Sequence, residues 1–175
     1  MSYSLCAAAA AAALLVAVPA YAHVELETDK APAGSSFKAV LMVPHGCTGS
    51  PTVALKVQIP EGVVHAQPMP KPGWTVKTVV KKLNKPVQYY STTLTEDVRE
   101  IEWSGGSLPD AYYDEFVFVA HLPDQPGAVV RFPTVQQCAK GVHRWIEIPA
   151  QGQDAEELKE PAPGVTLGPK AAGGD

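Results

Sequence analysis

Proline and glycine are spread densely along this sequence and leave no amphipathic helical segment of useful length in the mature chain. There are 17 prolines and 14 glycines among 175 residues, and between them lie short runs in which apolar and polar residues alternate. Proline interrupts a helix interior, whereas a period of two is typical of a strand with one buried face. The sequence therefore predicts an all-β fold.

The clearest run is PTVALKVQIP, residues 51–60, which places Val53, Leu55, Val57 and Ile59 on one face. Comparable runs occupy residues 36–44, 73–82, 86–95, 98–105, 112–123, 127–138 and 142–149. Many short strands separated by turn residues indicate a β-sandwich or a barrel. We predict a sandwich, because Cys47 and Cys138 lie at the ends of separate strands and can pin two sheets.

The N-terminus has the pattern of a signal peptide. Residues 5–18 are apolar or small, and they are too few to cross a bilayer as a helix. Pro19 then interrupts the run, and Ala20-Tyr21-Ala22 offers the small residues that signal peptidase accepts. We predict cleavage after residue 22, a mature chain that begins at His23, and export, most simply to the periplasm.

Two cysteines, Cys47 and Cys138, remain after cleavage. An even number in an oxidising compartment predicts a disulfide, and the alternative is a thiolate copper site. The whole chain carries a net charge of −4 and has no basic run, so nucleic acid is not expected as a partner.

The composition changes near Pro149. Residues 23–150 are expected to form one β-sandwich domain, whereas residues 151–175 are rich in Ala, Gly, Pro and acidic residues. Few of these residues can fill a core, so this segment is expected to be a flexible C-terminal tail.

His23 gains a second donor when Ala22 is removed. Its backbone nitrogen becomes a free amine, and the amine and the ring Nδ1 can hold one metal ion in a six-membered chelate. Nitrogen donors of this kind suit Cu(II), which tops the divalent affinity series. The alternative is that the cleavage position is incidental to His23.

Several stretches of this chain resemble the YcnI-like family of exported bacterial copper-binding domains, also known as DUF1775. They include AHVELE at residues 22–27, VPHGCTGSPTVALKVQIPEGV at residues 43–63, and YYDEFVFVAHLP at residues 112–123. The others are PKPGWTVK, IEWSGGSLP, FPTVQQCAKGVHRWIEIP and PAPGVTL. The resemblance implies an immunoglobulin-like or fibronectin-type β-sandwich that binds Cu(II).

The same resemblance implies a site in which the amine and imidazole of His23 are joined by a strand glutamate, with a tryptophan beside the metal. The matching residues here are Glu115 and Trp145. We expect Glu115 to lean inward, on one face with Val117 and Val119. Without the family pattern, Glu115 is a solvated acid at the end of a strand, and neighbouring Asp114 can supply the carboxylate ligand in its place. Without that pattern, Trp145 is a core residue.

His45, in the turn PHGCTG, is a possible additional copper ligand. The alternative is a turn histidine that bonds backbone groups near the disulfide. The remaining histidines and methionines are expected to be structural or exposed rather than ligands: His65, His121, His143, Met42 and Met69.

These features predict a Cu(II)-binding protein of copper trafficking or homeostasis that passes the ion to another exported copper chaperone or to a membrane copper transporter. Two alternatives stay open. One is a sandwich module for protein interaction in which His23 has no metal function. The other is a copper-dependent oxidoreductase, which is disfavoured because one histidine with a carboxylate favours Cu(II) over Cu(I). No enzymatic activity is expected.

Overall fold

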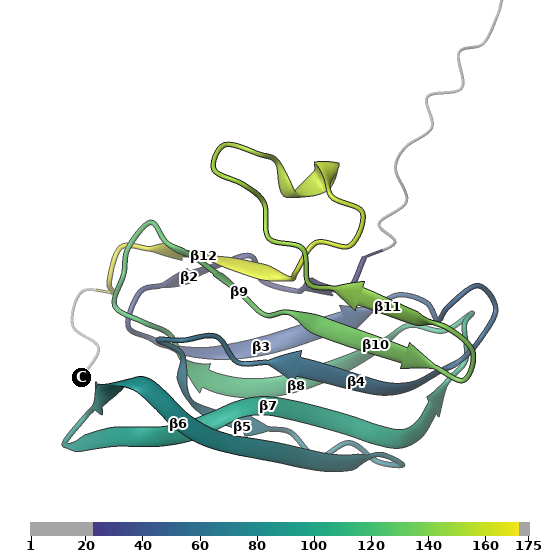
Figure 1. Ribbon diagram of the computed structural model, residues 1–175, viewed down its shortest axis with the longest axis horizontal. Helices are drawn as coiled ribbons and strands as arrows, with labels where there is room; N and C mark the ends of the chain where they lie inside the picture. The colour runs from purple at the N-terminus through teal and green to yellow at the C-terminus, as the bar shows by residue number, and fades with distance from the viewer. Residues whose placement is uncertain (1–22, 172–175) are drawn as a thin grey trace, which may run out of the picture.

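The computed structural model describes residues 23–171, and the expected signal peptide lies outside them. The described residues form a β-sandwich, as the strand pattern predicted (Figure 1). The only helical element among them is a single 3-10 turn, Ala155–Glu157. No helix in residues 23–171 is long and apolar enough to span a membrane.

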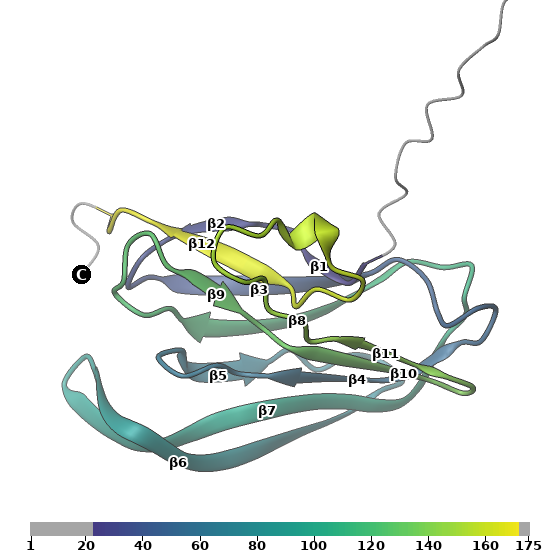
Figure 2. The ribbon, with the colours of Figure 1, turned by 45° about the horizontal axis from the view of Figure 1, so that its top comes forward.

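Two sheets make the sandwich (Figure 2). The four-stranded sheet has the order β1 (Glu25–Leu26), β3 (Ser36–Val43), β8 (Asp114–His121) and β5 (Val64–Pro68). The five-stranded sheet has the order β11 (Val142–Trp145), β10 (Thr134–Cys138), β4 (Thr52–Gln58), β7 (Thr92–Leu108) and β6 (Thr75–Tyr89). All neighbours in both sheets are antiparallel.

Alternating residues of the facing strands fill the space between the sheets. Phe116 and Phe118 of β8 are fully buried and meet Trp103 of β7 and Phe132, respectively, edge to face. Such aromatic pairs add to the stability that burial alone provides. Since the alternate residues of each strand must then point away from this core, the core side fixes which functional side chains lie outside it.

The β6–β7 hairpin is longer than the sequence predicted. Three separate runs, residues 73–82, 86–95 and 98–105, merge into two strands that turn at Tyr90 and Ser91. The pairing shifts between Lys82 and Val87, which is where Pro86 lies. Because β6 is an edge strand, the missing proline N–H is tolerated there.

Part of the segment that was expected to be a flexible tail belongs to a third, small sheet. It has the order β2 (Lys30–Pro32), β12 (Gly164–Gly168) and β9 (Val129–Arg131), with β12 parallel to β2 and antiparallel to β9. Val165 and Leu167 are buried in the main core. The tail prediction was wrong here because two apolar positions in a segment rich in Gly and Pro are too few to mark a strand.

Leu167→Ala is expected to lower the free energy of unfolding by about 2–5 kcal/mol, the cost of truncating a buried leucine. Val129→Ala, in the neighbouring strand, is the matched control because that side chain is 49% exposed, and it should cost less than about 1 kcal/mol. Urea unfolding of the two variants measures both values. Equal, small effects would mean that β12 contributes nothing to the core.

Candidate functional site

His23 lies at one open edge of the sandwich. Two residues that follow His23 closely, Val24 and Leu26, are buried in the core. They fix β1 to the sandwich next to His23. The imidazole centroid lies 5.4 Å from the Trp145 ring. β1 and β11 are edge strands of opposite sheets, and the contact between His23 and Trp145 therefore bridges the two sheets.

Acidic side chains surround His23. It borders a shallow hollow that Glu25, Asp29 and Glu156 also line. Partial burial raises the pKa of Glu25, the negative charge of Glu156 adds to the rise, and the nearby His23 opposes it. The segment between β11 and β12 carries Glu156 to this edge (Figure 1). Arg131 also lines the hollow, so three carboxylates and one guanidinium lie close to the imidazole, and the acidic groups outnumber the basic one.

Sequence reasoning missed both of these glutamates. Glu25 stands two residues after His23, so the alternation of β1 was a signal that it does not share the buried face of Val24. Glu156 had no such signal, because the family stretches do not include it and its segment was expected to be a flexible tail.

Glu115 lies elsewhere, and the expectation that it leans into the core is wrong. Since Phe116 and Phe118 fill the core, Glu115 points to the outer face of the four-stranded sheet. It pairs with Met42 of β3, which in turn pairs with Glu25 of β1. Two strand spacings, about 10 Å, therefore separate the backbones of the two glutamates.

Glu115 and Asp114 are engaged with other partners. The Tyr113 hydroxyl donates to Glu115 Oε1, and Lys71 Nζ donates to the backbone oxygen of Glu115 at 2.9 Å. Lys71 also forms an ion pair with Asp114 at 2.7 Å. Partial burial raises the pKa of Tyr113 to about 12, and the hydrogen bond and negative charge of Glu115 add to the rise.

Glu115→Gln is expected to lower the pKa of Tyr113 from about 12 toward the usual value of about 10. The amide still accepts the hydrogen bond, but it no longer opposes the negative charge of the phenolate. Ultraviolet titration at high pH, with Tyr113→Phe to identify the transition, measures the change. An unchanged transition would mean that the two side chains do not interact in solution.

Trp145 is both a core residue and a neighbour of the candidate site. It is 3% exposed, and its indole Nε1 donates to Gln136 Oε1 at 3.0 Å. The amide of Gln136, itself fully buried, donates to His45 O at 2.6 Å and to Thr52 Oγ1 at 2.8 Å. A hydrogen-bonded chain thus joins Trp145 to the loop between β3 and β4.

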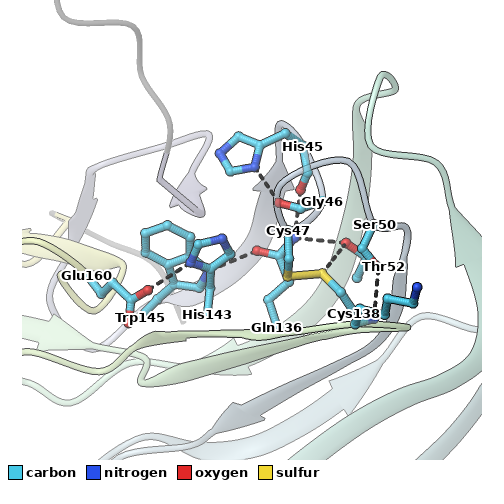
Figure 3. Close-up of a disulfide and its surroundings, with 11 residues drawn as sticks. His45, Gly46, Cys47, Ser50, Thr52, Gln136, Cys138, His143, Trp145 and Glu160 are labelled. Carbon is cyan, nitrogen blue, oxygen red and sulfur yellow. Dashed lines mark hydrogen bonds and ion pairs between the residues drawn. A yellow bond between two sulfur atoms is a disulfide. The ribbon is translucent and has the colours of Figure 1, made fainter.

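The predicted disulfide is confirmed. Cys47 and Cys138 are bonded, with a Cα–Cα separation of 6.0 Å (Figure 3). The bond fastens the loop after β3 to the end of β10, and therefore joins an element of one sheet to the other. The loop itself requires glycine at residue 46, because a Cβ there would lie 2.0 Å from the backbone oxygen of Ser50.

The disulfide holds His45 close to His143. The two imidazole centroids are 5.9 Å apart, and His143 stacks on Trp145 at 4.9 Å (Figure 3). His143 Nδ1 lies 2.8 Å from Glu160 Oε1, and His45 Nδ1 lies 2.6 Å from Gly46 O. His45 therefore bonds backbone near the bridge, and His143, expected to be structural or exposed, belongs to a histidine pair.

Burial alone would raise the pKa of Glu160. The hydrogen bonds from His143 and from the backbone N–H of Arg144, with the charges of His143 and Lys159, outweigh that effect and lower the pKa. Glu160 is therefore a carboxylate at neutral pH, as an acceptor for a histidine N–H must be.

The remaining histidines form a second aromatic group far along the chain from His23. His65 stacks on Tyr89 at 4.8 Å, and His121 meets the same ring edge to face at 5.3 Å. Within residues 23–171, His121 Nδ1 is buried without a hydrogen-bond partner. Burial lowers the pKa of His121, and the charges of His65 and Lys170 lower it further.

The predicted site residues thus fall into two places, one around Trp145 and the other at Glu115. The structure brings His23 to Trp145, and it brings His45 to His143 on the same tryptophan. In residues 23–171, no three or more His, Cys, Asp or Glu side chains are grouped to hold a metal ion. Of the methionines, Met42 is half-buried and Met69 is 52% exposed.

Comparisons with known proteins agree with this fold. Residues 23–167 match the model of a family described as a domain of unknown function, DUF1775. The chain also resembles a crystal structure of an uncharacterized protein from Nocardia farcinica with an immunoglobulin-like fold, at 27% identity and a TM-score of 0.61. That alignment covers 83% of this chain and 98% of the other. No curated protein matches.

Proposed function

The chain belongs to the DUF1775 family, and on that premise we propose that it is an exported, periplasmic protein that binds one Cu(II) ion at its processed N-terminus. The amine and the imidazole of His23 supply two nitrogen donors. A carboxylate supplies a third donor, and Trp145 shields the ion on one side. The resulting role is capture of Cu(II) and its delivery to another exported copper carrier or a membrane transporter, without catalysis.

The observation that carries the proposal is the position of His23. Its ring lies 5.4 Å from a nearly fully buried tryptophan and borders a hollow that carboxylates line. A buried ring held by the Gln136 amide gives the imidazole a fixed neighbour. An N-terminal residue fixed in this way loses less conformational freedom when it binds a metal than a residue at a frayed terminus would lose.

Two glutamates are candidates for the carboxylate donor. The family resemblance points to Glu115, whereas charge and proximity favour Glu25, which interacts with His23. Either one completes a set of two nitrogens and one oxygen, which suits tetragonal Cu(II). Since oxygen is a harder donor than nitrogen, such a set favours Cu(II) over Cu(I) and therefore suits storage and transfer better than redox cycling.

The test is a Cu(II) titration of the mature chain that begins at His23, followed by tryptophan fluorescence and by electron paramagnetic resonance. Bound Cu(II) quenches nearby indoles, so in the mature chain with His143→Ala, which keeps His23, the emission should fall until one equivalent has been added. The chain has three tryptophans, Trp74, Trp103 and Trp145. Trp145→Phe should remove most of this quenching, because Trp145 is the one whose ring contacts His23. A mature chain that binds no Cu(II) in competition with free glycine would overturn the proposal.

Paired substitutions identify the carboxylate. Glu25→Gln and Glu115→Gln are matched changes of equal size, and only the variant that lacks the true ligand should lower the affinity for Cu(II) and change the copper hyperfine splitting. If neither variant changes the spectrum, the third donor is neither glutamate, while the assignment of the amine and imidazole still stands on the titration.

A further inference from the structure

We infer that His45 and His143 form a second, separate divalent-cation site, with Cu(II) as its preferred ion. Nothing in this inference requires His23 to bind copper. It rests on the spacing of the two imidazoles, on the hydrogen bonds that fix their tautomers, and on the rigid elements that carry them.

The spacing of the rings fits a shared ion. A metal bonded to an imidazole nitrogen at 2.0–2.1 Å lies about 3.2 Å from the ring centroid, so two imidazoles on one ion have centroids between about 4.5 and 6.4 Å apart as the bond angle widens from 90° to 180°. The observed separation of 5.9 Å between His45 and His143 lies within that range. The rings stand edge to face, with 80° between their planes, so the side chains must rotate to aim both nitrogens at one ion.

Hydrogen bonds select the tautomer that binds metal. A carboxylate or carbonyl oxygen only accepts, so the Nδ1 atoms of His143 and His45 donate to Glu160 Oε1 and Gly46 O. The ring lone pair of each neutral imidazole is therefore on Nε2. A histidine whose other nitrogen donates to a carboxylate or a backbone carbonyl is the usual arrangement around protein-bound metals, because the hydrogen bond orients the ring and raises its basicity.

The supporting elements are rigid. His45 lies two residues before the disulfide cysteine Cys47, and its backbone oxygen accepts from the buried Gln136 amide. His143 pairs directly with Gln136 across the β10–β11 ladder. Gln136 thus positions both histidines, His45 through its side-chain amide and His143 through the backbone ladder, and the cost in entropy of bringing them together is met during folding rather than on binding.

Solvent reaches one of the two ligands. The side chain of His143 is 28% exposed and borders a hollow between the loop of Cys47 and the turn at Gly141. Two imidazoles with water in the remaining positions suit the later first-row ions, and Cu(II) stands at the top of that affinity series. Because Glu160 is engaged by His143 and the N–H of Arg144, it orients the ligand rather than binding the ion.

The experiment removes the N-terminal site first. A chain extended by Gly-Ser-Gly-Ser-Gly before residue 23, with His23→Ala, lacks the amine and the imidazole of that site and is here termed the capped chain. Titration of the capped chain with Cu(II) chloride should show one saturable equivalent, and pulsed electron paramagnetic resonance should detect two coordinated imidazoles. His45→Ala or His143→Ala in the capped chain should abolish saturation.

Two further variants separate ligation from folding. Glu160→Gln keeps both imidazoles and one acceptor oxygen, and it should weaken Cu(II) binding about 10–100-fold, as loss of an orienting carboxylate does at other histidine sites. His65→Ala, which removes an exposed histidine outside the pair, should leave binding unchanged. The inference is overturned if the capped chain binds no Cu(II), or if His65→Ala weakens binding as much as His143→Ala does. Neither outcome bears on the N-terminal site, which the mature chain with His143→Ala tests without the histidine pair.

Discussion

Mature protein extended by five residues before His23 will bind Cu(II) at its N-terminal site at least about 100-fold more weakly than the chain that begins at His23. The extension leaves the imidazole against Trp145 but converts the α-amine into an amide, which is not a donor to copper unless it is deprotonated. Loss of one strong nitrogen donor and of its chelate ring corresponds to about 3 kcal/mol or more at ten-fold per 1.4 kcal/mol.

The length of the extension matters for this experiment. One or two added residues would place a new amine and deprotonated amides beside the imidazole and create another copper chelate, so a longer extension is needed. Acetylation of the mature amine is an independent route to the same loss. His45→Ala and His143→Ala in the extended chain remove the contribution of the second histidine pair. Unchanged affinity after both treatments would show that the α-amine is not a ligand.

Replacement of Cys47 and Cys138 by alanine is expected to lower the free energy of unfolding by about 4 kcal/mol. The bond closes a loop with a sequence separation of 91 residues, and cross-linking a loop of that length removes about that much entropy from the unfolded chain. Since native domains are typically stable by 5–15 kcal/mol, this loss is a large share of the total. Guanidinium unfolding of the two proteins at neutral pH measures the difference.

The same pair of proteins tests the link between the disulfide and the histidine pair. With the disulfide removed, the loop of residues 44–50 keeps the hydrogen bond from Gln136 to the His45 backbone oxygen but loses its covalent link to β10. Cu(II) binding by the capped chain should therefore weaken in the alanine variant, while the N-terminal site keeps its affinity. In the unfolding experiment, a loss of less than about 1 kcal/mol in the free energy of unfolding of the alanine variant would mean that the unfolded chain is already compact around this loop.

Strand positions in the centre of the sandwich were predictable because one buried face imposes a period of two on the sequence. The runs at residues 36–44 and 51–60 correspond to β3 and β4. Short or irregular strands escaped this reasoning. β1 and β5 have too few residues to show a period, and β12 depends on pairing with β2 and β9, which are distant in sequence.

The candidate site was predictable only in part, and for a different reason. The proximity of His23 and Trp145 followed from the family pattern and not from local sequence, since 121 residues intervene between them. The direction of Glu115 was mistaken because Val117 and Val119 are apolar but Phe116 and Phe118 are larger and take the core. The pairing of His45 with His143 needed the register of β10 with β11, which no motif encodes.

β12 lies between β2, near the start of the mature chain, and β9 (Figure 2). Synthesis proceeds from the N-terminus, so β2 and β9 lack the strand that lies between them until residue 168 has been made. Because contacts over such sequence distances slow folding, this layer closes late in synthesis, which suits the export that we propose for this chain.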